Sequence, residues 1–154
     1  MTADRPLDLV CVSYLADAKV LRVAAYPQAN HGAVVLETVT SIAADGPLTA
    51  LIASSLGLRV GLVANHVGAD RAGQRLVRWI EAAGIHHAIS HDTDTSTPQL
   101  TVVTDDAGTR TWFAWLDHAY AQLRVADLRP LTQARLAYID CYGAIAAAAA
   151  RAAA

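Results

Sequence analysis

Two aspartates in this sequence stand where an open α/β sheet places groups that touch a ligand. Asp17 follows the apolar run Leu7–Ser13 (LDLVCVS), and Asp140 ends the apolar run Ala134–Asp140 (ARLAYID). Ligands of such sheets bind beyond the carboxyl ends of the strands, and carboxylate oxygens can accept hydrogen bonds from hydroxyl groups. For Asp17 the alternative is a turn or edge residue, which its position alone favours.

A loop of small residues, Ala43-Ala44-Asp45-Gly46-Pro47, is the third candidate. Small residues let backbone N–H groups approach a hydroxyl or phosphate closely, and the N-terminus of the helix that follows adds positive potential. The alternative is a tight loop-to-helix junction that binds nothing, since such junctions are common in α/β folds.

The other polar and aromatic candidates give weaker signals. His91, Asp92 and Asp94 could touch a cation, but they form no clean ligand set, and a solvated turn is the alternative. Trp112 and Trp115 are three apart, so a regular strand puts them on opposite faces. One could stack on a sugar ring, although packing is the favoured interpretation for both. We therefore expect no metal site and assign no catalytic residue.

A helix and a strand follow the small-residue loop. Pro47 is well placed as the first helical residue, and Gly57 is suited to end the helix because it adopts positive φ readily. The β-branched, mostly apolar run Arg59–His66 predicts a strand covered on both faces. The spacing predicts that the helix buries a stripe formed by Leu48, Leu51, Ile52 and Leu56.

A second, amphipathic helix is predicted over Asp70–Gly84, after the turn Gly68-Ala69-Asp70, with Asp70 as its N-cap. Its buried stripe is expected to consist of Leu76, Val77, Ile80 and Ala83. Its water-facing side is expected to carry Arg71, Arg75, Arg78 and Glu81.

Two pairs of strands carry polar residues. Lys19–Ala25 and His31–Ile42 suit a sheet covered on one face, either as a small lid or as an ordinary edge hairpin. Leu100–Thr104 and Thr109–Trp115 flank the strong turn signal Asp105-Asp106-Ala107-Gly108 and predict a hairpin. The remaining predicted elements are a strand at Ile85–Ser90, a polar loop at His91–Pro98, a short helix at Ala126–Thr132 and an Ala-rich helix from Ala144.

Composition narrows the class of protein. The 154 residues fit one domain or part of a larger one, and 54% hydrophobic content can fill a core. A net charge of −2 gives no basic footprint for nucleic acid, and no apolar run reaches the roughly 18 residues that span a bilayer. The N-terminus lacks a secretory signal, and Cys11 and Cys141 lack metal-ligand spacing. We therefore expect a cytoplasmic protein without nucleic-acid or membrane partners.

The Ala-rich end of the sequence raises the question of what lies beside the strand Ala134–Asp140. In a βαβ unit such a helix leads into another parallel strand, and here the sequence stops. That strand is expected to lack a neighbour, and an unpaired apolar edge is an aggregation hazard. The expectation is the front part of a larger α/β unit, as a fragment or as half of a two-chain assembly.

The order of these elements resembles the N-terminal half of the PfkB/ribokinase family of carbohydrate and nucleoside kinases. Its most specific piece is the turn Gly68-x-Asp70-x-x-Gly73 after the strand in Leu58–Gly73 (LRVGLVANHVGADRAG). Further matches are the strand that ends near Asp17, the lid hairpin, the loop and helix ending in Leu56-Gly57, Thr97–Trp112 (TPQLTVVTDDAGTRTW) and Ala134–Gly143 (ARLAYIDCYG).

The resemblance implies a ribokinase-like three-layer α/β sandwich with a mainly parallel sheet and a small β lid, incomplete in this chain. Residues 1–154 would form its N-terminal part, with lid strands at about 19–42 and 99–115 inserted. Such kinases transfer the γ-phosphoryl of ATP to a sugar or nucleoside hydroxyl, and they often dimerise through the lid. A homodimer through the lid is therefore a candidate assembly here, and the sequence leaves the oligomeric state open.

The family's site residues map onto this sequence only in part. By analogy Asp17 holds substrate hydroxyls, Ala44, Asp45 and Gly46 lie against the substrate, and Asp140 lines the pocket. The turn residues Gly68, Asp70 and Gly73 are expected to be structural. The family's Gly-Gly pair is replaced by Ala43-Ala44 and its loop asparagine by Leu48, which cannot make the hydrogen bond of an asparagine.

The family's catalytic machinery is not in this sequence. The catalytic aspartate of the family lies in a Gly-x-Gly-Asp loop, and neither this loop, a Walker A sequence nor G-x-G-x-x-G occurs here. ATP and Mg²⁺ are implied by the family, with ligands expected outside this chain. The expectation is the substrate-binding half of a sugar kinase, inactive alone. The alternative is a non-catalytic sugar-binding or regulatory module, and an unrelated α/β nucleotide binder is a weaker third. The sequence does not identify the sugar or nucleoside.

Overall fold

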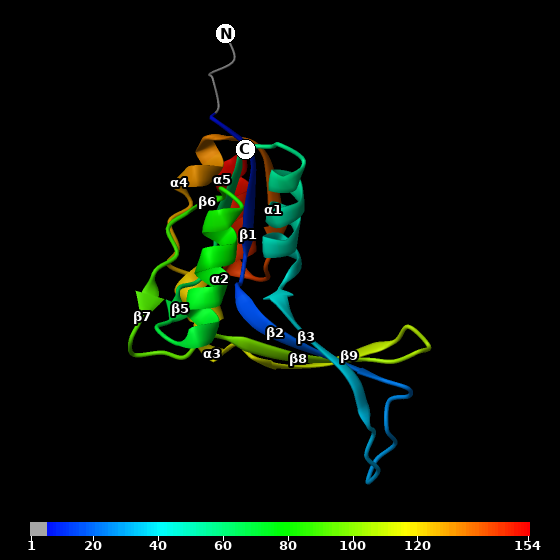
Figure 1. Ribbon diagram of the computed structural model, residues 1–154. Helices are drawn as coiled ribbons and strands as arrows, with labels where there is room; N and C mark the ends of the chain where they lie inside the picture. The colour runs from blue at the N-terminus through cyan, green and yellow to red at the C-terminus, as the bar shows by residue number, and fades with distance from the viewer. Residues whose placement is uncertain (1–5) are drawn as a thin grey trace.

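The computed structural model describes residues 6–154, and its centre is a parallel four-stranded sheet with the strand order β10-β1-β4-β6 (Figure 1). Every pairing in this sheet is parallel, as expected for strands joined by helical crossovers. The central strands are buried on both faces, which explains their runs of Val, Leu and Ile. The four strands are β1 (Leu7–Ser13), β4 (Val60–Val63), β6 (His86–His87) and β10 (Ala134–Asp140).

Helices cover both faces of this sheet and make the molecule three-layered. One face packs against α1 (Asp45–Ser55) and α2 (Arg71–Ala82), around a core that includes Cys11, Leu62 and Ile80. The opposite face packs against α4 (Arg129–Thr132) and α5 (Ala144–Ala153), around Val10, Val63 and Leu131. The remaining helix is α3 (Asp117–Leu123).

A second sheet, the lid sheet, projects from the carboxyl end of β1 and has the order β3-β2-β8-β9 (Figure 1). Two antiparallel hairpins form it, and the parallel pairing of β2 with β8 joins them. The predicted lid hairpins are therefore confirmed as hairpins, and they unite into one sheet. Its strands are β2 (Ala16–Val23), β3 (Val35–Ala43), β8 (Gln99–Thr104) and β9 (Arg110–Trp115).

Several predicted boundaries were wrong. The strand expected over Arg59–His66 is only the four residues of β4, and the one expected over Ile85–Ser90 is the two residues of β6. Instead, β5 (Val67–Gly68), at the start of the predicted turn, pairs with β7 (His91–Asp92), which lies inside the predicted polar loop. Helix α3 was not predicted, and the short helix expected over Ala126–Thr132 is shortened to α4.

The buried face of α1 differs from the prediction. The helix begins at Asp45, before Pro47, and it turns its small residues Gly46, Pro47, Ala50 and Ala53 to the sheet. Of the predicted stripe only Leu51 packs against the core, whereas Leu48, Ile52 and Leu56 point outward, with Ile52 62% and Leu56 76% exposed. The reason is close packing, because a Cβ on Gly46 would lie 2.3 Å from Cβ of Ser13. The predicted stop is confirmed, since Gly57 follows the helix with a φ of +86°.

Helix α2 follows its sequence pattern closely. Asp70 is its N-cap and accepts a hydrogen bond from the Gly73 N–H at 2.8 Å. The predicted residues Leu76, Val77 and Ile80 are buried, whereas Ala83 is only partly buried. The prediction that Arg75 faces water was wrong, since its side chain is only 27% exposed and forms an ion pair.

The outer edge of β10 is open in the described part of the chain, as expected. β10 pairs with β1 and with no other described strand, and Leu136 on this strand is 68% exposed. Both cysteines, Cys11 and Cys141, are buried and free, which agrees with the expectation of isolated thiols. Among the described helices, none combines the length and apolar character needed to cross a membrane.

Candidate functional site

The Asp140 carboxylate lies at the N-terminus of α1, at the carboxyl end of the parallel sheet. Its Oδ2 accepts hydrogen bonds from the Ser13 hydroxyl at 2.9 Å, the Asp45 N–H at 3.0 Å and the Gly46 N–H at 3.2 Å. Unpaired N–H groups at a helix N-terminus attract negative charge, and here the protein itself supplies it. No hydrogen bond within residues 6–154 reaches Oδ1, so this oxygen is available to accept one from a ligand.

The backbone around Asp140 explains how these groups meet. Ser13 and Asp140 are register partners in the parallel pairing of β1 with β10, so their side chains lie next to each other. Gly46 can approach Ser13 only because it has no Cβ. Ala44 has φ 78° and ψ 149°, a conformation that is almost restricted to glycine and stores about 1–3 kcal/mol in other residues. Strain of this kind concentrates at ligand sites.

Three tyrosines, Tyr14, Tyr120 and Tyr142, lie close to one another, and the charge of Asp140 acts on the first two. The rings of Tyr14 and Tyr120 lie 5.8 Å apart between centroids, tilted by 58°. Burial raises the pKa of Tyr14 to about 12, and the nearby Tyr120 and the charge of Asp140 add to the shift. Burial also raises the pKa of Tyr120, with further contributions from Tyr142 and Asp140. Tyr14 and Tyr120 thus both lie near the Asp140 charge and stay neutral, able both to donate and to accept hydrogen bonds.

The structure therefore brings four of the five predicted site residues together. Asp140, Asp45 and Gly46 share hydrogen bonds, and Ala44 precedes them in the strained loop. We call Asp140, Ser13, the loop Ala44–Gly46 and the three tyrosines the α1 site. This arrangement offers hydroxyl acceptors, hydroxyl donors and aromatic faces in one place, which is the chemistry that recognises a polyhydroxylated ligand.

Asp17, the fifth predicted site residue, is engaged elsewhere. Its Oδ1 accepts a hydrogen bond from Nη2 of Arg75 on α2 at 2.6 Å, and no contact within residues 6–154 joins it to Asp140. The Arg75 guanidinium also lies over the ring of Trp79, 5.7 Å from the centroid. Asp17 keeps its second oxygen without a hydrogen bond inside the described chain, so its predicted role as a hydroxyl acceptor stays a prediction.

The turn Gly68-x-Asp70-x-x-Gly73 has structural contacts, as expected. Asp70 accepts hydrogen bonds from the Gly73 N–H, the Thr97 N–H and the Thr97 hydroxyl. A Cβ on Gly73 would lie 2.1 Å from the Gly68 carbonyl oxygen, so both glycines permit this close packing. The turn ties α2 to the segment that leads into β8 of the lid sheet.

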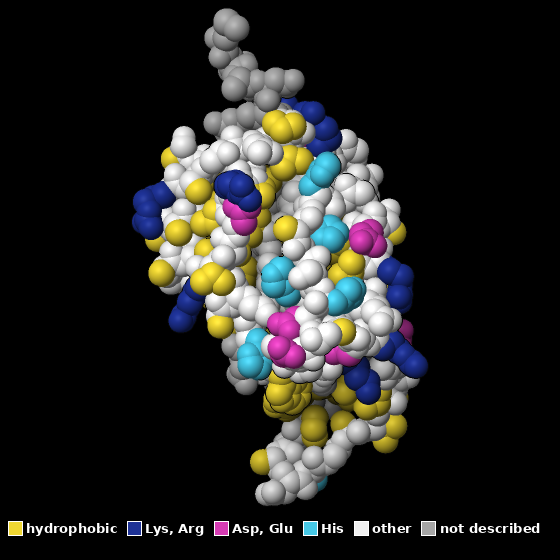
Figure 2. All heavy atoms as spheres, turned by 90° about the vertical axis from the view of Figure 1, so that its left-hand side faces the viewer, with side chains coloured by type: hydrophobic (Ala, Val, Ile, Leu, Met, Phe, Trp, Pro, Cys, Tyr) yellow, Lys and Arg dark blue, Asp and Glu magenta, His cyan; other side chains and the backbone are white. Residues whose placement is uncertain are grey.

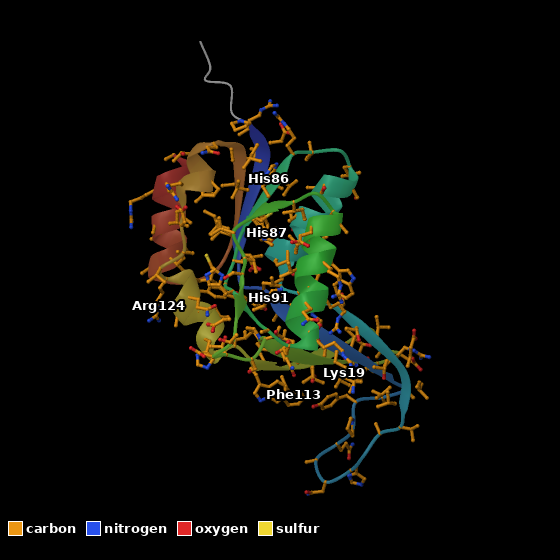
Figure 3. All side chains as sticks on the ribbon, turned by 60° about the vertical axis from the view of Figure 1, so that its left-hand side comes forward. Lys19, His86, His87, His91, Phe113 and Arg124 are labelled. Carbon is orange, nitrogen blue, oxygen red and sulfur yellow. The ribbon has the colours of Figure 1, made fainter. Side chains whose placement is uncertain are left out.

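Histidine side chains gather on a different face, beside β6 and β7 (Figures 2 and 3). A groove of about 490 Å³ lies next to them and is lined in part by His66, His86 and His87. The Nδ1 atoms of His66 and His87 accept hydrogen bonds from the N–H groups of Ser90 and Ile89 and are therefore occupied. No group of three or more described residues could hold a metal ion, His91, Asp92 and Asp94 included.

Neither ATP nor Mg²⁺ fits the residues described here. The N-terminus of α1 is occupied by the Asp140 carboxylate, so its N–H groups are not free for a phosphate. The sequence holds no phosphate-binding loop, and the described residues hold no metal cluster. The α1 site offers hydrogen-bond acceptors and donors suited to hydroxyl groups.

Sequence reasoning missed Ser13, Arg75 and the three tyrosines. Ser13 could have been found, because it ends β1 as Asp140 ends β10. Tyr14 directly follows Ser13, and Tyr142 lies two residues after Asp140, which is a usable signal. Tyr120 and Arg75 carry no local signal, since each reaches its partner through long-range packing.

No protein-family model matches this chain, and no curated protein matches it in sequence. Solved structures do match its fold. A fructokinase from Halothermothrix orenii aligns with a TM-score of 0.73 over 96% of this chain and 53% of its own, at 16% identity. A ribokinase from Thermotoga maritima aligns with a TM-score of 0.64 over 85% of this chain and 44% of its own, at 16% identity.

A nucleoside kinase of the ribokinase family from Methanocaldococcus jannaschii aligns with a TM-score of 0.57 over 71% of this chain, at 20% identity. This alignment covers 36% of that kinase, so the chain spans about half the length of the kinases it matches, or less. The resemblance expected from the sequence is thereby confirmed at the level of the fold. The chain has the ribokinase-like fold, over the part that corresponds to about half of such a kinase.

Proposed function

We propose that this chain supplies the acceptor-binding part of an ATP-dependent sugar kinase. The observation that carries the proposal is the Asp140 carboxylate, held at the N-terminus of α1 with one oxygen free. In the proposed role, Oδ1 accepts a hydrogen bond from a sugar hydroxyl, while Oδ2 stays fixed by Ser13 and the two backbone N–H groups. Tyr14 and Tyr120 supply further hydrogen-bonding groups and apolar ring faces for the sugar.

The lid sheet supports the same proposal. It projects from the carboxyl end of β1, next to the α1 site, where a cover would exclude water. Phosphoryl transfer benefits from exclusion of water, because water would compete for the phosphoryl group. In this proposal Asp17, at the root of the lid, offers its unpaired oxygen to a second substrate hydroxyl.

The nucleotide, its Mg²⁺ and the catalytic base belong, in this proposal, to the remaining half of the fold. The open edge of β10 is where that half would join, since Leu136 and Tyr138 are exposed there. α5 lies on the face opposite α1, and the usual right-handed crossover from β10 through α5 leads to this edge. In a polypeptide that contains both halves, the next parallel strand would therefore lie beside β10.

We also propose that two copies associate through the lid sheet. One apolar row crosses all four strands, since Val39, Val20, Val102 and Trp112 are successive register partners. Trp112 is 60% exposed and Val39 is exposed as well, so this face is unpartnered in a single chain. A second copy of the same face would cover the row by an isologous contact.

A non-catalytic sugar-binding or regulatory module is the second candidate. It is favoured by Leu48, which stands where the matching kinases' family has an asparagine, and by the Asp140 carboxylate, which already satisfies the α1 N-terminus. The downstream reading frame separates the two candidates, because a Gly-x-Gly-Asp segment favours the kinase. The alternative predicts sugar binding with no turnover in any longer form of the protein.

Isothermal titration calorimetry with ribose, fructose, a sugar acid and adenosine tests the proposal on the chain as it exists. We expect one of these ligands to bind, and Asp140→Asn to weaken it at least tenfold, since a hydrogen bond to a charged group contributes about 1.5–3 kcal/mol. The matched control is Asp127→Asn, an exposed aspartate paired with Arg129 outside the site. We expect no sugar-dependent ADP formation by this chain alone. Equal affinities of the two variants would overturn the site.

A further inference from the structure

The lid sheet carries a second pocket, separate from the α1 site, of about 390 Å³. Its walls include Ser96, Gln99, Thr101, Trp115 and His118, and we call it the lid pocket. We infer that the lid pocket is a binding site for a neutral saccharide ring, which stacks on Trp115. Its volume falls in the usual range of small-molecule sites, roughly 300–1,000 Å³.

Strand register explains how the lid pocket is assembled. Asp17, Gln99 and Trp115 are successive register partners across β2, β8 and β9, so they form one row on one face of the lid sheet. Lys19, Thr101 and Phe113 form the next row on the same face, and Figure 3 labels Lys19 and Phe113 on this sheet. This face carries mostly polar side chains, and its two rows end at Trp115 and Phe113 on β9. The opposite face carries the apolar row that ends at Trp112.

Four side chains of the lid pocket are unoccupied hydrogen-bonding groups, whereas the Thr97 hydroxyl in the same lining is bonded to Asp70 and Gly68. Within residues 6–154, Ser96, Gln99, Thr101 and His118 make no side-chain hydrogen bond to the protein. Serine and threonine hydroxyls both donate and accept, and the Gln99 amide does both as well, which matches the hydroxyl groups of a sugar. Among the lining residues whose side chains the structure describes, none is a Lys, Arg, Asp or Glu, so these walls offer no fixed charge to bind a phosphate or a carboxylate.

Trp115 supplies the apolar surface that a saccharide ring needs on its C–H face. Trp115 is 60% exposed beside the pocket, although removing the apolar surface of an indole ring from water is favourable. The sequence favoured packing for both Trp112 and Trp115, and the structure contradicts this, because both are 60% exposed. The cost of leaving Trp115 in water is offset when a ligand covers the ring.

Trp112 is a matched control for this inference. It lies three residues from Trp115 on the same strand and is equally exposed, but it points to the opposite face. The chain contains only three tryptophans, so the indole N–H signals in a ¹H–¹⁵N spectrum report on Trp79, Trp112 and Trp115 separately. The experiment titrates the labelled chain with glucose, maltose and maltotriose, with glucose 6-phosphate as the charged comparison.

We expect the neutral sugars to shift the Trp115 indole signal and to leave those of Trp112 and Trp79 in place. Trp115→Leu and Gln99→Ala should weaken binding at least tenfold, whereas Trp112→Leu should change it less than twofold. Unchanged affinity in Trp115→Leu, or no shift of the Trp115 signal at saturating sugar, would overturn the inference. Asp140→Asn keeps this site and the proposed function distinguishable, because it should weaken binding at the α1 site at least tenfold and leave the Trp115 shift intact.

Discussion

Asp17 and Arg75 form an ion pair of 2.6 Å that joins the root of the lid sheet to α2. Both side chains are largely removed from solvent, Asp17 at 14% exposure and Arg75 at 27%. The Arg75 Nε is buried and has no hydrogen-bond partner within the described chain. An arginine with an unsatisfied nitrogen is a poor choice for stability alone, which suggests that its position serves to hold the Asp17 carboxylate.

Replacing Arg75 should destabilise the fold, because it leaves the Asp17 carboxylate half-buried and unpaired. For Arg75→Gln we expect a loss of about 1–3 kcal/mol in the free energy of unfolding, measured by urea denaturation. Arg78→Gln on the exposed side of the same helix should change stability by less than about 0.5 kcal/mol. The double variant Asp17→Asn/Arg75→Gln should lose less than the sum of the single losses, and strict additivity would show that the pair is not coupled.

Gly73→Ala should be among the most destabilising single-methyl changes in the chain. The added Cβ would lie 2.1 Å from the Gly68 carbonyl oxygen, so α2 must move away from the turn that anchors it. We expect a loss of about 2 kcal/mol or more in the free energy of unfolding. The matched control is Gly32→Ala, where nothing lies within 4 Å of the new methyl group and stability should hardly change.

Stability should fall in acid in a way that depends on Asp70. Burial alone would raise the pKa of Asp70, but the N–H groups of Thr97 and Gly73 and the Thr97 hydroxyl outweigh it and lower the pKa below the usual value. A lowered pKa in the folded state gives stability that is present above the unfolded pKa of about 3.9 and lost as pH falls through the folded value. Asp70→Asn should therefore make the free energy of unfolding depend less on pH below about pH 4. An unchanged pH dependence in this variant would show that Asp70 is not the cause.

The sequence could predict those elements whose signals are local. Asp70 at the start of α2, its Leu76 and Ile80 stripe and the Asp105–Gly108 turn each depend on residues close in the chain, and the structure has all of them. The face of α1 could not be predicted in this way. The large apolar side chains of Ile52 and its neighbours predicted the buried face. In the structure α1 lies so close to the sheet that small residues form this face instead.

Sequence reasoning found those residues of the candidate site that lie where parallel strands end. Asp140 and the loop before α1 were found because both lie where parallel strands end, and the structure joins them. Arg75 could not be found, since helical periodicity placed it on the solvent side of α2. Only the lid sheet, whose root passes beside α2, gives it the Asp17 partner across 58 residues of sequence.

The lid contact between two copies can be tested against the opposite face of the same sheet. Trp112→Gln places a polar group in the apolar row and should shift the mass measured by light scattering from a dimer toward a monomer. Trp115→Gln, an equally exposed tryptophan on the other face, should leave the mass unchanged. A dimer with a micromolar Kd would be largely assembled at a chain concentration of about 100 μM, so a wild-type chain that stays monomeric there would rule out this dimer.

Ala44→Gly should make the protein more stable, although glycine usually destabilises. Ala44 adopts φ 78° and ψ 149°, a conformation that costs a residue with a Cβ about 1–3 kcal/mol and costs glycine almost nothing. Part of this gain is lost to the greater freedom of glycine in the unfolded chain, so we expect a net gain of about 1 kcal/mol. For a domain of this size that is a rise in Tm of roughly 2–4 °C, measurable by circular dichroism. Ala50→Gly, inside the same helix and fully buried, should lower stability by about 1 kcal/mol. If Ala44→Gly also lowers stability, the strained loop is not the conformation in solution, and the hydrogen bonds from Asp45 and Gly46 to Asp140 lose their basis.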